Sequence, residues 1–252
     1  MTRIILSGCN GKMGRVITEC VAGREDCEII AGFDKETTLN SNFPVFSSPD
    51  ECTAKADVII DFSHPSALSP LLKFALAQNM PTVICTTGLD SAQIAEIEQA
   101  SKVIPIFFSA NMSIGVNLIA ELAKTAAKLL GQAFDIEIIE KHHNQKIDAP
   151  SGTALMLANE ISSVLPREPQ YVYDRHSQRA KRTKNEIGLH AIRGGTITGD
   201  HDVIFAGRDE VITISHSASS KEVFATGSVS AALFLANRPV GLYTMADLVK
   251  NV

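Results

Sequence analysis

The first 110 residues alternate short apolar segments with amphipathic segments of helical spacing. Segments rich in Val, Ile, Leu and Phe predict strands at residues 3–7, 28–33, 57–62, 81–85 and 103–108. Between them, apolar positions three and four apart predict helices at residues 13–21, 67–79 and 91–101. Continuously apolar strands that alternate with helices are typical of a parallel sheet covered on both faces. We therefore predict a Rossmann-like, doubly wound α/β domain.

The pattern changes after residue 111. Residues 116–130 carry a helical apolar stripe, and residues 134–141 alternate apolar with acidic positions, as in a half-buried strand. Residues 202–206 and 210–216 flank a Gly-Arg-Asp turn, which predicts a hairpin and therefore antiparallel pairing. We predict a second, α+β domain with a mixed sheet, after which the helical C-terminal stretch returns to the first domain.

Composition and charge narrow the class of protein. Hydrophobic residues make up 45% of the chain and charged residues 20%, as in ordinary globular proteins. The longest apolar runs, such as residues 103–108, are far shorter than the roughly 20 residues that cross a bilayer, and glycine and polar residues interrupt the apolar start, unlike a secretory signal. The net charge of −5 disfavours a nucleic-acid surface. We expect a cytoplasmic protein with neither a membrane nor a nucleic-acid partner.

Two local features predict no chemistry of their own. The five cysteines are odd in number and form no CxxC pair, so we expect neither a disulfide framework nor a thiolate metal site. We expect their thiols to be buried. Residues 175–184 contain six basic side chains without an apolar period, which indicates a solvated loop.

A glycine-rich loop follows the first predicted strand: Gly8-Cys9-Asn10-Gly11-Lys12-Met13-Gly14. Glycines let the backbone approach a pyrophosphate, and the amides at a helix start favour its charge, although the spacing is GxxGxxG rather than GxGxxG. Asp34 ends the second predicted strand, where a carboxylate can bind an adenine ribose. Lys35 follows it and suits the 2′-phosphate of NADPH. The loop predicts a nicotinamide cofactor and leaves NADH and NADPH open.

Two further loops follow predicted strands, at the edge of the sheet where ligands of α/β folds bind. Their sequences are Cys85-Thr86-Thr87-Gly88 and Ser109-Ala110-Asn111-Met112. We expect them to border the nicotinamide, and ordinary turns are the alternative. Residues 109–113 also form a plausible hinge between the two domains.

The candidate chemistry lies in residues 140–153, where a predicted strand leads to His142, His143 and Lys146. Histidine titrates near neutral pH and can give a proton, and lysine can stabilise developing negative charge. A helical apolar stripe begins after Ser151, so the amides of residues 151–153 lie at a helix start that suits a carboxylate. We therefore predict proton transfer next to an anion-binding site.

A metal site is another interpretation of His142 and His143. Adjacent histidines on a strand point to opposite faces, and neither a nearby Cys nor HExxH completes a ligand set, so no metal is expected. The glycine-rich residues 193–201 suit a second acidic group on the substrate, and a long hairpin connection is equally open.

The sequence also bears on other classes of protein. No tyrosine has a lysine four residues later, as a short-chain dehydrogenase requires, and no GxSxG elbow marks a serine hydrolase. A non-enzymatic dinucleotide sensor needs no proton donor, so the presence of both His142 and Lys146 disfavours it.

Over essentially its whole length the sequence resembles the 4-hydroxy-tetrahydrodipicolinate reductase family, also called dihydrodipicolinate reductase, of bacterial lysine and diaminopimelate synthesis. The most specific element is residues 142–154, and residues 8–14, 86–88, 111–117 and 193–201 support it in the same order. The resemblance implies a cytoplasmic, usually homotetrameric enzyme that uses NADH or NADPH to reduce 4-hydroxy-tetrahydrodipicolinate (dihydrodipicolinate), a cyclic dicarboxylate, to tetrahydrodipicolinate.

The resemblance also implies roles for individual residues. His142 matches the proposed proton donor and Lys146 the catalytic lysine, while His143, Gly152 and Thr153 match substrate-binding residues. The cofactor contacts are matched by Gly8, Cys9, Asn10, Gly11, Lys12, Met13, Asp34, Lys35, Cys85, Thr86, Thr87, Ser109, Ala110, Asn111 and Met112. At Cys85 the family often has glycine, so only a backbone contact is carried over.

The resemblance assigns a function to each domain. Residues 1–112 with 221–252 would form the dinucleotide-binding domain, and residues 113–220 the substrate-binding and oligomerisation domain. Closure about the hinge at residues 109–113 would bring nicotinamide and substrate together and exclude water.

Overall fold

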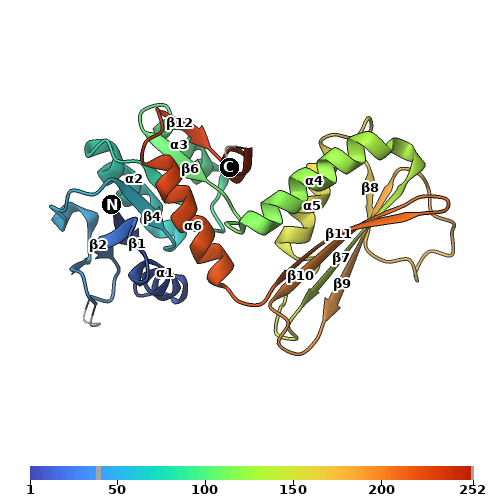
Figure 1. The fold of residues 1–252 in the computed structure, drawn as a ribbon, viewed down its shortest axis with the longest axis horizontal. Coiled ribbons are helices and arrows are strands. Elements are labelled where there is room, and N and C mark those ends of the chain that lie inside the picture. The colour runs from blue at the N-terminus through green and yellow to red at the C-terminus, as the bar shows by residue number, and fades with distance from the viewer. Residues whose placement is uncertain (38–40, 251–252) are drawn as a thin grey trace. The chain divides into compact units, whose positions relative to one another are not determined.

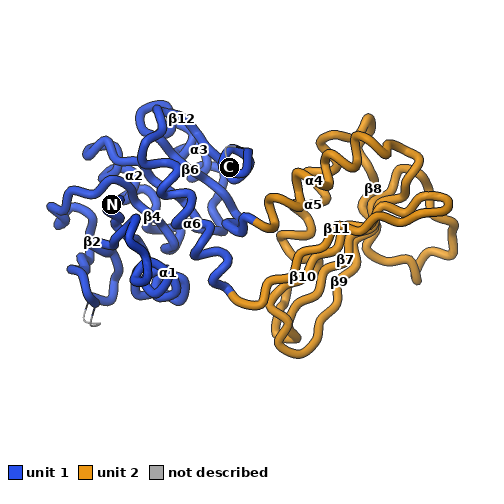
Figure 2. Tube along the Cα trace, in the orientation of Figure 1, with its two compact units in different colours: residues 1–114, 221–252 blue, residues 115–220 orange. Residues whose placement is uncertain are grey.

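The computed structural model describes residues 1–37 and 41–250 (Figure 1). The chain divides into two compact units, residues 1–114 with 221–252 and residues 115–220 (Figure 2). The last two residues of the predicted first domain, 251 and 252, lie outside the described residues. The chain passes between the units twice, before residue 115 and after residue 220.

Within the described residues, unit 1 contains a seven-stranded sheet whose neighbouring strands are all parallel. Its elements are β1 (Thr2–Ser7), α1 (Lys12–Ala22), β2 (Cys27–Phe33), β3 (Val45–Phe46), β4 (Val58–Asp61), α2 (Leu68–Ala77), β5 (Thr82–Ile84), α3 (Ser91–Ala100), β6 (Pro105–Phe108), α6 (Glu222–Leu235), β12 (Gly241–Tyr243) and α7 (Met245–Lys250). The order β12-β6-β5-β4-β1-β2-β3 reverses between β1 and β4, which makes that position the switch point of a doubly wound sheet. The predicted fold class of this domain is confirmed.

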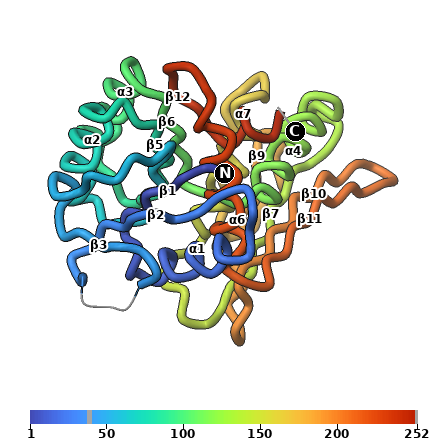
Figure 3. The backbone as a smooth tube through the Cα atoms, turned by 60° about the vertical axis from the view of Figure 1, so that its left-hand side comes forward, coloured from blue at the N-terminus to red at the C-terminus, as the bar shows by residue number. Residues whose placement is uncertain are grey.

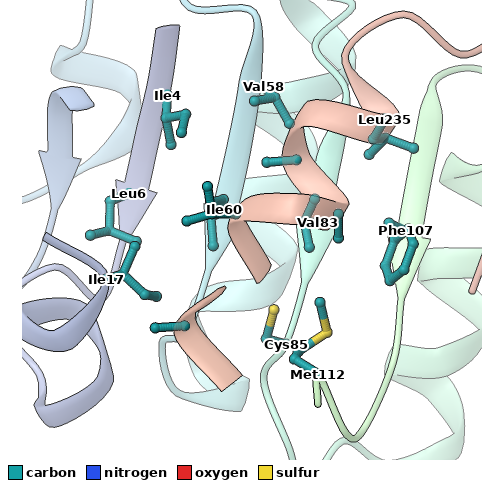
Figure 4. Close-up of a cluster of buried hydrophobic side chains, with 14 of the residues drawn as sticks. Ile4, Leu6, Ile17, Val58, Ile60, Val83, Cys85, Phe107, Met112 and Leu235 are labelled. Carbon is teal, nitrogen blue, oxygen red and sulfur yellow. The ribbon is translucent and has the colours of Figure 1, made fainter. Parts of the chain in front are cut away.

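Both faces of this sheet are buried by helices. Successive side chains of each strand point to opposite sides, so each strand contributes to both buried faces. On β1, Ile4 and Leu6 pack with α1, α6 and α7, whereas Ile5 packs with α2 and α3 on the other face. Figure 4 shows the first of these clusters, in which Val83 and Leu235 lie between the sheet and α6. Figure 3 shows α2 and α3 beside one another along the sheet. Helices on both faces account for the continuously apolar strands in the sequence.

In unit 2, the described residues form a five-stranded mixed sheet in the order β11-β10-β7-β9-β8. Its elements are β7 (Asp135–His142), α5 (Gly152–Ser162), β8 (Gln170–Val172), β9 (Glu186–Arg193), β10 (Gly199–Ala206) and β11 (Val211–Ala218), with α4 (Ile114–Leu130) leading in from unit 1. β10 pairs antiparallel with β7 and β11, and β9 pairs parallel with β7 and β8. One face packs against α4 and α5 through residues such as Ile138, Leu157 and Phe205. The predicted mixed sheet and the hairpin before β11 are confirmed.

The sequence pattern missed β3 and β12 in unit 1. β3 and β12 have two and three residues and lie at the two edges of the unit 1 sheet. Segments of this length are too short to show a period of two. β8 and β9, in unit 2, were not predicted either.

The basic segment at residues 175–184 contains neither helix nor strand, but it is not uniformly solvated as predicted. Arg175 and Arg182 form ion pairs with Glu137 of β7, and the side chain of Arg182 is only 17% exposed. Arg182 also donates to the backbone oxygens of Ile136 and Glu186. The acidic positions of β7 lie about forty residues away in sequence, so the local pattern could not reveal these partners.

Candidate active site

The glycine-rich loop lies between β1 and α1 at the switch point of the unit 1 sheet. Gly8 has a φ of 76°, and a Cβ there would lie 2.6 Å from the carbonyl oxygen of Phe62. A Cβ on Gly14 would lie 2.2 Å from the carbonyl oxygen of Gly8. Among the described residues, no side chain caps α1 at Gly11. The loop therefore needs glycine for its own close packing and presents the first amides of α1 to an incoming anion.

Asp34 and Lys35 follow β2, the strand that lies beside β1 in the sheet. The Asp34 carboxylate accepts hydrogen bonds from the backbone amides of Asn10, at 2.9 Å, and Glu36, at 3.2 Å. Both residues line a cleft of about 570 Å³ together with Gly8 and Gly11. That volume lies within the roughly 300 to 1,000 Å³ of small-molecule sites. The two positions predicted for pyrophosphate and ribose thus border one cleft.

A second cleft, of about 310 Å³, adjoins the first, because Phe62 and Ser63 border both. Its lining includes six of the residues predicted to contact the cofactor: Met13, Cys85, Thr86, Thr87, Ala110 and Met112. The sequence reasoning did not identify Phe62 and Ser63. They follow β4, whose carboxyl end neighbours that of β1, so the strand order of a doubly wound sheet was the available signal.

Several predicted cofactor residues use their side chains inside the protein. The Thr86 hydroxyl donates to the fully buried Asp61 carboxylate at 2.7 Å, and burial raises the pKa of Asp61. Burial, and then the nearby Asp34, raise the pKa of the Cys9 thiol to about 11. Burial also raises the pKa of Cys85 well above its usual range. Any contact of these three residues with a cofactor therefore falls mainly to their backbone atoms.

The remaining predicted cofactor residues lie elsewhere around the loops. Asn10 lines a third cavity, of about 370 Å³, beside Cys9 and Arg15. Lys12 is exposed at the first position of α1. The Ser109 hydroxyl donates to the Asn111 carbonyl oxygen at 2.9 Å, within the turn after β6. Ser109 and Asn111 thus shape this turn.

In unit 2, β7 ends at His142, and this residue is 9% exposed. His142 Nδ1 lies 2.7 Å from Oε2 of Glu140, two residues earlier on the same face of the strand. Glu140 has no exposed surface, and Arg193 of β9 donates to both of its oxygens at 2.7 Å. Burial alone would raise the pKa of Glu140, but the hydrogen bonds from Arg193, His142 and the Ser151 amide outweigh it and lower that pKa. His142 therefore sits beside an ionised, fully paired carboxylate.

Ser151 caps the start of α5 in unit 2. Its hydroxyl oxygen accepts from the Ala154 amide at 3.2 Å and lies 3.1 Å from Nε2 of His201, and its amide donates to Glu140 at 2.9 Å. Gly152 is exposed, and first-turn amides have no acceptor within their own helix. The predicted anion-binding helix start is thus coupled through Ser151 to the carboxylate that holds His142.

Lys146 follows in the loop between β7 and α5. Its Nζ lies 2.8 Å from the Asp148 carboxylate, and its amide donates to the His143 carbonyl oxygen at 3.2 Å. The hydrogen bond from Lys146 is the main cause of a lowered pKa of Asp148. The side chain of Lys146 is 22% exposed. The cation is therefore held close to the strand end that carries His142.

Residues 193–201 connect β9 to β10, and one of the two interpretations made from the sequence, a hairpin connection, is wrong. β9 and β10 flank β7 and do not pair with each other, so their connection is not a hairpin. Arg193 donates hydrogen bonds to Glu140 and to the carbonyl oxygen of Asp148. His201 is buried, at 4% exposure. The segment supports His142 and Glu140 from the neighbouring strands, a role that sequence reasoning missed.

Within residues 1–37 and 41–250, no three His, Cys, Asp or Glu side chains are grouped so that they could hold a metal ion. The same part of the chain has no helix with the length and apolar character needed to cross a membrane.

A doubly wound parallel sheet with a glycine loop at its switch point, and a carboxylate after the next strand, defines the class of dinucleotide-dependent oxidoreductases. The chain belongs to the dihydrodipicolinate reductase family. The family described as dihydrodipicolinate reductase, N-terminus, matches residues 2–112, and that described as dihydrodipicolinate reductase, C-terminus, matches residues 115–249. The family predicted from the sequence is confirmed.

Relatives and solved structures agree with this assignment. The chain is 55% identical over 251 residues to a 4-hydroxy-tetrahydrodipicolinate reductase of Caldanaerobacter subterraneus subsp. tengcongensis, covering 100% of this chain and 99% of the relative. It is 54% identical to that of Clostridium tetani, covering 100% and 98%. A dipicolinate-bound dihydrodipicolinate reductase from Paenisporosarcina sp. TG-14 is 26% identical, with a TM-score of 0.83 over 100% of both chains.

Proposed function

We propose that this chain reduces 4-hydroxy-tetrahydrodipicolinate (dihydrodipicolinate) to tetrahydrodipicolinate with NADH or NADPH, in the synthesis of diaminopimelate and lysine. Two relatives, 55% and 54% identical to this chain, are named 4-hydroxy-tetrahydrodipicolinate reductase, and the similarity covers 99% and 98% of their length. The observation that carries the proposal is that His142, the loop with Lys146 and the start of α5 follow one another at the end of β7. A proton donor, a cation and a carboxylate site are what reduction of a cyclic dicarboxylate requires.

Unit 1 fits a dinucleotide. The glycine loop packs so closely against neighbouring backbone atoms that no Cβ fits at Gly8 or Gly14. The adjoining clefts have a size suited to a small molecule. Amides of residues 8–13 would hold the pyrophosphate, Asp34 or Lys35 would face the ribose, and residues 85–87 and 109–112 would border the nicotinamide. When bound, the cofactor supplies the hydride. Asp34 suits NADH and Lys35 suits the extra phosphate of NADPH, so the proposal covers both.

Unit 2 would bind the substrate and handle the proton. The Paenisporosarcina enzyme is described as dipicolinate-bound, and dipicolinate is a planar ring with two carboxylates. The amides of Gly152 and Thr153, with His143 nearby in sequence, would hold one carboxylate at the start of α5. His142 would give the proton that follows reduction of the ring. Lys146 would stabilise the negative charge that develops before protonation.

The proposal includes a homotetramer in the cytoplasm. α4 and α5 cover one face of the unit 2 sheet, while the opposite face carries apolar side chains such as Ile192, 47% exposed, and Val211, 63% exposed. Apolar side chains on an open sheet face favour burial against another protein surface. Light scattering after size-exclusion chromatography measures the assembly directly, and a monomer at micromolar concentration would contradict this part of the proposal.

The activity itself is tested with the unmodified chain. Freshly generated product of dihydrodipicolinate synthase is added, and oxidation of NADH and of NADPH is followed in separate assays. We expect substrate-dependent oxidation with at least one of the two. A control without the synthase product measures background oxidation. No turnover with either cofactor would contradict the proposed function.

A further inference from the structure

Glu140 is a buried charge that the proposed chemistry does not use directly. Its side chain has no exposed surface, and each carboxylate oxygen accepts two hydrogen bonds. Oε2 accepts from His142 Nδ1 and Arg193 Nη1, and Oε1 accepts from Arg193 Nη2 and the Ser151 amide, all between 2.7 and 2.9 Å. A carboxylate with this complete set of donors is rigidly held and stays ionised.

This arrangement determines which nitrogen of His142 is available. An ionised carboxylate only accepts hydrogen bonds, so Nδ1 must carry a hydrogen and Nε2 is left for other chemistry. Among the described residues Nε2 has no hydrogen-bond partner, and it is not one of the buried unpaired atoms, so it reaches solvent. A Cβ on Gly199 would lie 3.0 Å from Nε2. Glycine at this position keeps the space beside Nε2 open.

The second histidine of the cluster stays neutral. The His201 ring lies edge-on to that of His142, with 5.3 Å between centroids. Burial, and then the neighbouring His142, lower the pKa of His201 to about 4. His216, opposite His201 on β11, also has a pKa lowered by burial. The His201 imidazole therefore adds no positive charge beside Glu140 and His142.

The groups around His142 come from every neighbouring element of the sheet and from α5. They are Glu140 of β7, Arg193 of β9, His201 of β10, His216 of β11 and the uncharged Ser151 that caps α5. Glu140 is the anion among them that touches the His142 ring.

We propose that Glu140 is the positioning residue for the proton donor. It orients the His142 ring so that Nε2 faces the substrate side, and it places a negative charge against Nδ1. Arg193 acts on His142 only through Glu140, because its bidentate contact holds the Glu140 carboxylate in place. This inference rests on the proposed role of His142 in the reductase reaction.

The main test is Glu140→Gln, which keeps the shape of the side chain and removes its charge. We expect kcat to fall about 10- to 100-fold, as is usual when a group that orients a functional side chain is lost, while KM for the cofactor changes little. The high-pH limb of the kcat profile should move to lower pH, because an anion beside a general acid favours the protonated form of that acid and the variant lacks this anion. A purely structural role would not move that limb.

Glu137→Gln is the matched control. Glu137 lies on the other face of the same strand and pairs with His190 Nε2 at 2.7 Å and with Arg175 and Arg182, so it has the same kinds of partner away from the site. Its kcat and pH profile should match wild type in a sample whose oligomeric state is unchanged. An equal shift in both variants would overturn the inference, because any lost β7 carboxylate would then have the same effect.

Two further variants separate this inference from the proposed function. If His142→Gln lowers kcat but Glu140→Gln leaves both kcat and the pH limb unchanged, the positioning role is wrong and the function stands. If His142→Gln is itself fully active, the proposed proton donor is wrong. In the His142→Gln background, Glu140→Gln should cause no further loss. Should Glu140→Gln fail to fold, Arg193→Lys decides, since it keeps the charge of residue 193 and loses the bidentate contact that holds Glu140 in place. An unchanged kcat in that variant would also overturn the inference.

Discussion

The starts of α1 and α5 both present backbone amides of a first helical turn, but the side chains around them differ. α1 begins after Gly11 with no side-chain cap among the described residues, and close main-chain packing at Gly8 and Gly14 shapes its loop. α5 begins after Ser151, whose hydroxyl caps the helix and whose amide donates to Glu140. Helix amides alone can bind an anion. The side chains around α5 add a group that can also move a proton.

This difference has a structural cause. The loop before α1 lies at the carboxyl edge of a parallel sheet, where it packs closely against backbone atoms of the loop after β4, and glycine is the residue that permits this packing. α5 packs against one face of the unit 2 sheet, so its start meets side chains that project from β7, β9 and β10. A binding loop therefore depends on backbone shape, whereas the second site depends on side chains from several strands.

Removing the proton donor or its neighbouring cation should have the largest effect. We expect His142→Gln and Lys146→Ala each to lower kcat by about 100-fold or more, since a general acid typically contributes that much. Cofactor affinity, measured by titration of NADH fluorescence, should change little because both residues lie in unit 2. Near-normal turnover in both variants would remove the chemical distinction between the two helix starts.

A methyl group in the glycine loop should affect binding and spare the chemistry. In Gly14→Ala the new Cβ would lie 2.2 Å from the Gly8 oxygen and 2.5 Å from the Cys9 oxygen, so the loop must shift. We expect the cofactor KM to rise about tenfold or more, which corresponds to roughly 1.4 kcal/mol. Gly23→Ala is the control, because a Cβ there meets nothing within 4 Å. Equal KM values in the two variants would show that close packing at Gly14 is unimportant.

The side-chain cap should make α5 sensitive to a change that has no counterpart at α1. Ser151→Ala removes the hydrogen bond to the Ala154 amide and the contact with His201, and we expect a loss of about 1 kcal/mol in the free energy of unfolding. Urea unfolding followed by circular dichroism measures it. Ser163→Ala, at the other end of α5, is the control. A loss no greater than in that control would mean that the cap contributes nothing measurable.

The smallest expected effect concerns the choice of cofactor. Lys35 is exposed at the rim of the larger cleft, and an exposed charge contact contributes about 0.2 to 1 kcal/mol. We expect Lys35→Ala to lower kcat/KM for NADPH by no more than about fivefold and to leave NADH unaffected. Comparing both cofactors in wild type and variant checks this. Unchanged NADPH use would show that Lys35 does not contact the 2′-phosphate.

The longer elements of the fold could be predicted from local pattern. Residues 3–7 were predicted as a strand and β1 spans Thr2–Ser7, and residues 116–130 were predicted as a helix that α4 contains. Local periodicity suffices here because each element buries a face of its own. The edge strands β3 and β12 could not be predicted this way, since their pairing partners stabilise them and their own two or three residues do not.

For the site, the sequence by itself determined the two loops and the segment from His142 to Thr153, because glycine spacing and a helix start are local properties. Only the tertiary structure decided that Arg193 meets Glu140, 53 residues away. The parallel register of β7 and β9 places Arg193 opposite His142, and register is a property of two strands together. Sequence therefore located the chemical groups, and strand pairing decided that Glu140 and Arg193 lie together beside His142.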